Sequence, residues 1–174
     1  VNYDKNIIDK VSGEYANLGK EEYFKGEKIL VRRTGDKIIA TIDRNGYFVS
    51  NNFFVLYPKP KEGVDLLRIL AILNSQLGTW YFLTIQPRKG KLFAEIKINH
   101  LAEIPIPNDI KTTNVLAKLV DKMLFLNKEL HETPENSDEW NSLKSEIEKT
   151  DRKIDDEVYK LYGLTEDEIK VVEG

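Results

Sequence analysis

The sequence predicts an α+β fold, in which a small antiparallel β meander with buried helices precedes a C-terminal antiparallel helical hairpin. Between residues 28 and 58, short β-rich runs alternate with glycine-containing turns, which is typical of antiparallel strands. After residue 114, apolar residues recur at spacings of three and four, which indicates amphipathic helices. A length of 174 residues with 41% hydrophobic and 32% charged residues fits one globular domain with a helical extension.

The first third of the chain predicts a polar lead-in followed by a sheet. Residues 1–27 show no sustained period and are expected to contain at most one short helix. The three expected strands cover residues 28–33, 37–42 and 47–58. Pro58 and Pro60 end the last strand, because proline cannot donate a hydrogen bond to a neighbouring strand.

The middle of the chain predicts buried helices and one further strand. Residues 64–75 have too many apolar positions for one stripe, so this helix should be covered on most sides. The charge-free stretch 69–87 is nearly as long as a membrane span, but its polar and helix-breaking residues favour two short helices with a break. Alternation over residues 92–98 predicts a strand, and Pro105 and Pro107 predict an extended exit.

The remainder predicts a helical hairpin from Val115 to Leu161. Thr133-Pro134 is expected to begin its second helix and Gly163 to end it, while Thr165 and Glu168 form a capping box for a last short helix. The expected seam comprises Leu119, Met123, Leu126, Leu130, Leu143, Ile147, Ile154 and Val158. We therefore place a first, β-containing unit at residues 1–110 and a helical unit at residues 111–174.

Charge is distributed unevenly between the two halves. Residues 20–100 contain 14 Lys/Arg against 8 Asp/Glu, whereas residues 101–174 contain 10 against 18. The first half is therefore suited to a polyanion and the second repels one. The alternative is that the excess of positive charge is merely a solvated surface.

Several kinds of catalytic chemistry find no support in the sequence. There is no cysteine, the two histidines lie 31 residues apart, and no two glycines are separated by a single residue. These facts argue against thiol catalysis, a histidine metal site, a dinucleotide fingerprint and a phosphate loop. Residues 95–97 match the E-x-K pattern of metal-dependent nucleases, but residues 168–170 match it equally well. We expect no catalytic and no metal-binding residues in this chain.

Basic and amide side chains near the predicted turns are the candidate DNA-binding residues. Lysine and arginine contact phosphates, and an asparagine amide can pair with adenine through two hydrogen bonds. The candidates are Lys28, Arg32, Arg33, Lys37, Arg44, Asn45, Asn51, Asn52, Arg88, Lys89 and Lys91. The alternative is that Arg32 and Arg33 lie on opposite strand faces, one solvated and one paired with an acidic neighbour such as Asp36.

Nine aromatic residues of the same region could stack on bases, but we expect them to fill the core first. They are Tyr47, Phe48, Phe53, Phe54, Tyr57, Trp80, Tyr81, Phe82 and Phe93.

Three segments of the chain resemble the TaqI-like C-terminal specificity domain. They are KILVRRTGDKIIATIDRNGYFVSNNFFVLYP, LLRILAILNSQLGTWYF and KGKLFAEIKINHLAEIPIP. The most telling parts are Leu-Asn-Ser before an aromatic cluster and the Pro-Ile-Pro exit, and the resemblance covers roughly residues 15–110. The end of the chain, residues 158–169, is also similar to the way such enzymes finish.

The resemblance implies a target-recognition domain of a type IIG restriction-modification enzyme or a related adenine-N6 DNA methyltransferase. Such a module reads duplex DNA while a covalently linked domain flips and methylates an adenine with S-adenosylmethionine, and a fused nuclease would use Mg. The family's catalytic Asn/Asp-Pro-Pro-aromatic tetrapeptide cannot occur here, because no two prolines are adjacent. We therefore expect a cytoplasmic, non-catalytic fragment of a site-specific DNA adenine methyltransferase or restriction endonuclease, with no membrane partner.

Two other interpretations stay open at this point. The chain could be half of a type I restriction specificity subunit, whose recognition domain is also followed by a helical spacer. It could instead be a helical protein-interaction module that does not bind DNA.

Overall fold

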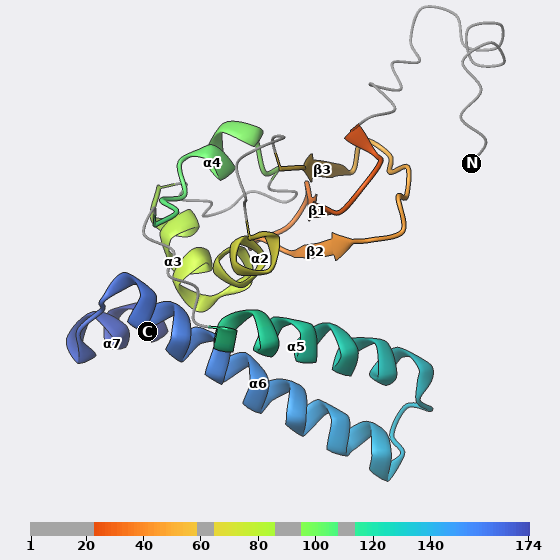
Figure 1. The fold of residues 1–174 in the computed structure, drawn as a ribbon. Helices are drawn as coiled ribbons and strands as arrows, with labels where there is room; N and C mark the ends of the chain where they lie inside the picture. The colour runs from red at the N-terminus through yellow and green to blue at the C-terminus, as the bar shows by residue number, and fades with distance from the viewer. Residues whose placement is uncertain (1–22, 59–64, 86–94, 108–113) are drawn as a thin grey trace, which may run out of the picture.

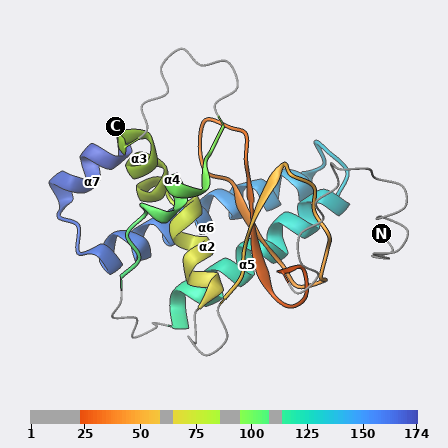
Figure 2. The same ribbon diagram turned by 90° about the horizontal axis from the view of Figure 1, so that it is seen from above.

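The computed structural model describes residues 23–58, 65–85, 95–107 and 114–174, and it shows a three-stranded antiparallel sheet with helices packed on one face (Figure 1). The elements are β1 (Lys28–Arg32), β2 (Ala40–Asp43), β3 (Phe53–Leu56), α2 (Leu66–Asn74), α3 (Gln76–Ile85), α4 (Ile98–Ala102), α5 (Asn114–Glu132), α6 (Asp138–Tyr162) and α7 (Glu166–Glu173). Helix α2 packs on β1 and β2 and, on its other side, on α5, so it lies between the sheet and the hairpin (Figures 1 and 2). The predicted α+β class is confirmed.

Strand β1 is the centre of the sheet, and its side chains alternate between two faces. Ile29 and Val31 are fully buried in the core that contains α2, and each lies between partners on β2 and β3. The opposite face carries Lys28 and Leu30, which are buried, and at its end Arg32 and Phe53, which are exposed and lie directly across from each other in the register. We call this second surface the open face of the sheet, because α2 does not cover it.

The strand order β2-β1-β3 differs from that of a meander, in which β2 would be central. The outer edge of β2 is already occupied by the side chain of Asn74, at the end of α2. Its Oδ1 accepts from the Ala40 N–H at 2.9 Å, and its Nδ2 donates to the Ala40 carbonyl at 2.9 Å. Strand β3 pairs with the other side of β1.

The predicted break in the charge-free stretch is confirmed at Ser75, between α2 and α3. Ser75 is extended, and its hydroxyl donates to the Ile72 carbonyl at 2.8 Å and accepts from the Gly78 N–H at 3.0 Å. A Cβ on Gly78 would lie 2.2 Å from the Ile72 oxygen. Glycine at this position therefore allows α3 to start directly against the last turn of α2.

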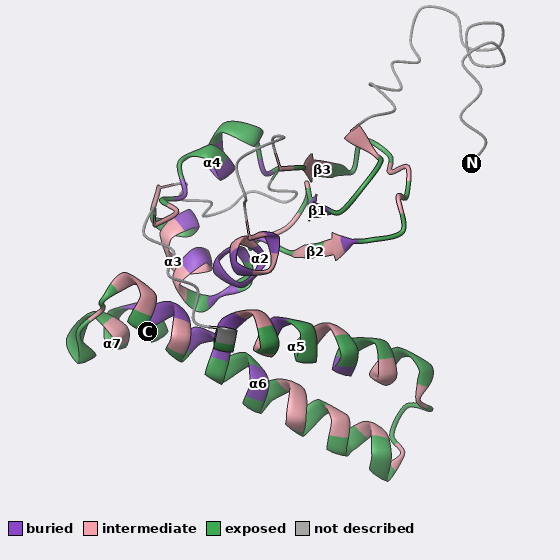
Figure 3. Cartoon of the chain, in the orientation of Figure 1, coloured by how far each residue is buried: buried purple, intermediate pink, exposed green. Residues whose placement is uncertain are grey.

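Helices α5 and α6 form the expected antiparallel hairpin, and its base joins the core of the sheet (Figure 1). Leu116 and Val120 from α5 and Ile154 and Val158 from α6 belong to the same buried cluster as β1. The far end of the hairpin extends beyond α2 and is mostly exposed (Figure 3). Val115, where the predicted hairpin begins, is 49% exposed.

The predicted capping residues at the helix ends are confirmed, with one exception. Gly163 ends α6 in the left-handed conformation, and Thr165 with Glu168 caps α7. The prediction that Thr133-Pro134 begins the second helix is wrong. The Thr133 hydroxyl instead donates to the carbonyl of Glu129 at the end of α5, and Ser137 caps α6.

Two further predictions fall wholly or partly outside the described residues. The lead-in over residues 1–27, where at most one short helix is expected, lies mostly in the undescribed residues 1–22, and the first three residues of the expected strand 92–98 lie in the undescribed residues 86–94. At the end of that strand, Glu95 forms an isolated antiparallel bridge with Thr34, and Ile98 already begins α4. Among the described helices, none combines the length and the apolarity that crossing a membrane requires.

Candidate nucleic-acid interface

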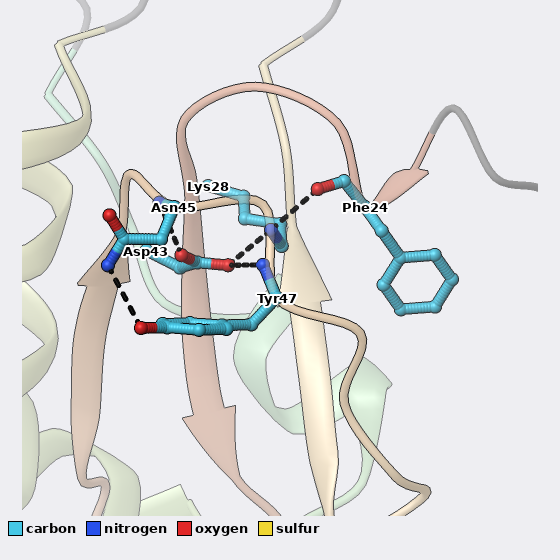
Figure 4. Close-up of polar contacts among 5 residues, drawn as sticks. All are labelled: Phe24, Lys28, Asp43, Asn45 and Tyr47. Atoms are coloured by element: carbon cyan, nitrogen blue, oxygen red, sulfur yellow. Dashed lines mark hydrogen bonds and ion pairs between the residues drawn. The ribbon is translucent and has the colours of Figure 1, made fainter. Parts of the chain in front are cut away.

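The structure places Lys28 in the interior, which corrects its assignment as a DNA-binding residue. Lys28 is 0% exposed; its ammonium pairs with the Asp43 carboxylate and donates to the Phe24 carbonyl at 2.7 Å (Figure 4). A buried ammonium whose donors are engaged inside the protein cannot reach a phosphate. Alternation along β1 does not reveal this, because Lys28 precedes the first buried apolar residue and its partner is on another strand.

Arg33 is held at the edge of the sheet by groups distant in sequence. Its guanidinium pairs with Glu95 and donates to the Asn51 carbonyl at 2.8 Å, and it lies 5.1 Å from the ring centre of Phe54. The sequence interpretation that one of the two neighbouring arginines pairs with an acid is thus correct. The acid is Glu95 rather than Asp36.

Arg44 connects the turn after β2 to two other segments. It donates to Glu27 at 2.7 Å and to Asp121 of α5 at 3.2 Å, and these hydrogen bonds raise its pKa. Half of the side chain is exposed. Because exposed ion pairs contribute little free energy, a phosphate can compete with these carboxylates for the guanidinium.

Arg32 and Lys37 are the exposed cations of the first hairpin, and they lie in different surroundings. Arg32 is at the end of β1 on the open face, and it forms no ion pair with any residue in the described ranges. Lys37 lies within electrostatic range of Asp151 on α6. Arg32 is therefore well placed to meet an anion, whereas Lys37 is turned toward the acidic hairpin.

The three candidate asparagines are all exposed, at two ends of the sheet. Asn51 and Asn52 form the turn before β3, next to Arg32 and Phe53. Asn45 lies in the turn after β2, at the opposite end. The remaining candidates, Arg88, Lys89 and Lys91, lie outside the described residues, as does Phe93.

The expectation that the aromatic residues fill the core is wrong for three of them. Phe82 is fully buried, but Tyr47, Phe53 and Tyr57 are 60%, 39% and 45% exposed. Phe53 and Tyr57 alternate along the chain with the half-buried Phe54 and Leu56, which pack on the core. The run from Phe53 to Tyr57 is apolar throughout, so the sequence does not show which of its side chains face solvent.

The carboxylates near this surface are engaged in ion pairs rather than grouped together. Glu95, the acid of the E-x-K pattern, pairs with Arg33. Burial raises the pKa of Asp43, but the hydrogen bonds from Lys28 and from two backbone N–H groups lower it below its ordinary value. No group of three or more acidic or histidine side chains that could hold a metal ion occurs in the described part of the chain.

On the described surface, exposed amides, aromatic rings and arginines flank a small sheet. The family model for the TaqI-like C-terminal specificity domain matches residues 1–106. The chain therefore belongs to the TaqI-like C-terminal specificity domain family, and it is a specificity module of the kind found in restriction-modification enzymes. The match includes the whole sheet and ends before α5. No curated protein gives a match to the chain.

Proposed function

We propose that this chain binds duplex DNA and supplies sequence recognition to an adenine-N6 methyltransferase domain, linked to it covalently in a type IIG restriction-modification enzyme. The family match over residues 1–106 carries the proposal. The positive charge of residues 20–100 supports it, because cations that neutralise phosphates provide most of the sequence-independent affinity for DNA. In this proposal the open face and the turns at its two ends approach the duplex.

Arg32 is the phosphate-contacting residue that we propose with the most structural support. It is exposed on the open face, beside the exposed ring of Phe53 and the turn that carries Asn51 and Asn52. Arg33 and Arg44 are secondary candidates, since each must first leave its carboxylate partners. Arg88, Lys89 and Lys91 stay in the proposal on sequence grounds.

We also propose that residues 111–174 support the recognition unit, residues 1–110, rather than contact DNA. The base of the hairpin is part of the core, through Leu116, Val120, Ile154 and Val158. The excess of acidic residues over residues 101–174 repels phosphates.

Methyl transfer belongs to the linked domain in this proposal. The chain has neither the Pro-Pro tetrapeptide nor glycines at the spacing of a cofactor loop. Two amides line the cleft beside β2, and both are engaged: Asn74 bonds the backbone of Ala40, and Asn127 donates to the Met123 carbonyl. These residues do not fit S-adenosylmethionine. Incubation of the chain with labelled S-adenosylmethionine and duplex DNA should transfer no label, and reproducible labelling of adenine would contradict this assignment.

The proposal is tested by fluorescence anisotropy with a labelled duplex over a series of salt concentrations. The parent chain should bind at low salt, and Arg32→Gln should reduce the slope of log affinity against log salt by about one unit. Lys118→Gln removes a charge from an exposed position of α5 and should leave the slope unchanged. Failure of the parent to bind at low salt would refute DNA binding, and equal slopes for Arg32→Gln and the parent would refute the role of Arg32.

A further inference from the structure

The turn after β2 is held in place by the carboxylate of a buried ion pair. The carboxylate of Asp43 accepts from the backbone N–H of Asn45 at 2.8 Å and from that of Tyr47 at 2.8 Å, and it also pairs with Lys28 (Figure 4). The side chains of Asp43 and Lys28 are only 1% and 0% exposed. We call Lys28 and Asp43 the clamp and residues 44–47 the clamped turn.

A buried ion pair is not the obvious way to stabilise a small sheet. Removing both charges from water is costly, and apolar replacements of such pairs are often equally stable. This pair, however, satisfies two backbone donors of the turn that no apolar side chain could satisfy. Its specific effect is therefore on the conformation of the turn.

Gly46 provides the backbone conformation that the clamped turn requires. Its φ of 73° lies in the left-handed region, which favours glycine. A Cβ at this position would be 3.6 Å from the carbonyl oxygen of Phe24, the same oxygen that accepts from Lys28, so the segment before β1 and the turn after β2 lie close together beside the clamp.

The clamped turn presents two side chains to solvent in a fixed relation. Asn45 is exposed, Tyr47 is 60% exposed, and the Asn45 amide donates to the Tyr47 hydroxyl at 3.3 Å. This bond uses one N–H of the amide, so its second N–H and its Oδ1 are available for the paired donor and acceptor of an adenine edge. An aromatic ring beside such an amide adds contact area at small entropic cost, because it has few rotatable bonds.

We infer that the clamped turn is a base-reading element, in which Asn45 and Tyr47 contact base edges of duplex DNA and the clamp acts as a pair of positioning residues. A rigid backbone reduces the ordering cost of recognition, which is what a specificity element requires. This inference rests on the proposed function and gives Lys28 a positioning role in place of the phosphate contact predicted from the sequence.

Selection of duplexes from a randomised pool tests the inference. The 174-residue parent should enrich a sequence motif, and Asn45→Ala and Tyr47→Ala should each lose the preference at the same one or two base positions. For a duplex altered at such a position, we expect the variants to lose about tenfold or more of the parent's discrimination, since one bidentate pair provides roughly this ratio. Their affinity for an unrelated duplex should stay at the parent's level, because the phosphate contacts are intact.

Two matched controls come from the hairpin. Phe125 on α5 is 60% exposed, like Tyr47, and Asn141 on α6 is an exposed amide like Asn45. Phe125→Ala and Asn141→Ala should keep the full motif. Asp43→Asn should lose the same base positions as Asn45→Ala while it retains affinity for unrelated duplex, a separation that a purely structural role would not produce.

The possible failures are distinguishable. If the parent binds no duplex, the proposed function itself is wrong. If the parent binds and enriches a motif that Asn45→Ala and Tyr47→Ala leave unchanged, the inference is overturned and the proposed function stands. Binding without any enriched motif also overturns it. Since both substitutions are on exposed side chains, they test the inference even if Asp43→Asn does not fold.

Discussion

Asp155 provides a pH-dependent test of how the hairpin joins the rest of the molecule. This carboxylate is on α6, is only 7% exposed, and accepts from the Gln76 N–H at 2.8 Å at the start of α3. Its pKa is raised to about 6: burial is the largest cause, the negative charges of Asp151, Asp156 and Glu173 contribute to the rise, and the hydrogen bond from the Gln76 N–H opposes it. Compared with the unfolded state, the native state therefore favours the protonated form of the Asp155 carboxyl group.

The expected magnitude follows from the two pKa values. A rise from 3.8 to about 6 means that charged Asp155 lowers the free energy of unfolding by about 3 kcal/mol at pH 8 and by about half of that at pH 5. The stability associated with protonated Asp155 is complete below pH 3.8 and is lost as the pH rises through 6. Asp155→Asn keeps an acceptor for Gln76 without the charge, so it should be more stable than the parent at pH 8, by a difference that shrinks toward pH 5.

Urea unfolding of the parent and the variant at several pH values measures this difference. Asp156→Asn removes a charge from the exposed neighbouring position, and it should change the free energy of unfolding little at either pH. An Asp155→Asn variant that is less stable than the parent at pH 8, or whose pH profile is parallel to that of the parent, would refute the reasoning.

Three further predictions concern the helices. Gly78→Ala should lower the melting temperature, because the new Cβ would lie 2.2 Å from the Ile72 oxygen. Helix propensity alone would raise the melting temperature, so a measured rise would contradict the close contact between α2 and α3. Leu126→Ala removes a side chain that is 6% exposed and should cost about 2 to 5 kcal/mol in urea unfolding, and an unchanged value would place it outside the hairpin seam. The double variant Lys149→Ala, Lys153→Ala should keep the duplex affinity of the parent in anisotropy titrations, whereas a large loss without loss of stability would move the DNA surface onto α6.

The sequence predicted the features whose causes are local. Gly163 ends α6 because a left-handed terminal residue favours glycine, and Thr165 caps α7 because a Glu three residues later completes the box. The break at Ser75 could also be predicted, because its cause is local in the sequence. The prediction was wrong where two capping residues competed: Ser137, rather than Thr133, caps α6.

The candidate site depended on partners that are distant in sequence. Lys28 pairs with a residue 15 positions away, Arg33 with one 62 positions away, and Arg44 with one 77 positions away in α5. Nothing in the local pattern separates these three cations from Arg32, which forms no ion pair within the described residues. The segment Asp43-Arg44-Asn45-Gly46 was identified as a turn from the sequence. The burial of Lys28 beneath it, however, can be deduced only from the register between the strands.

Hydrogen–deuterium exchange of the chain with and without duplex DNA tests most directly whether the open face and its turns recognise DNA. The account predicts slower exchange on DNA binding in peptides covering residues 43–53, which contain the clamped turn, Asn51 and Asn52, with no change over residues 138–153 of α6. Protection confined to the hairpin, or no protection in any peptide at a DNA concentration that saturates binding, would contradict it.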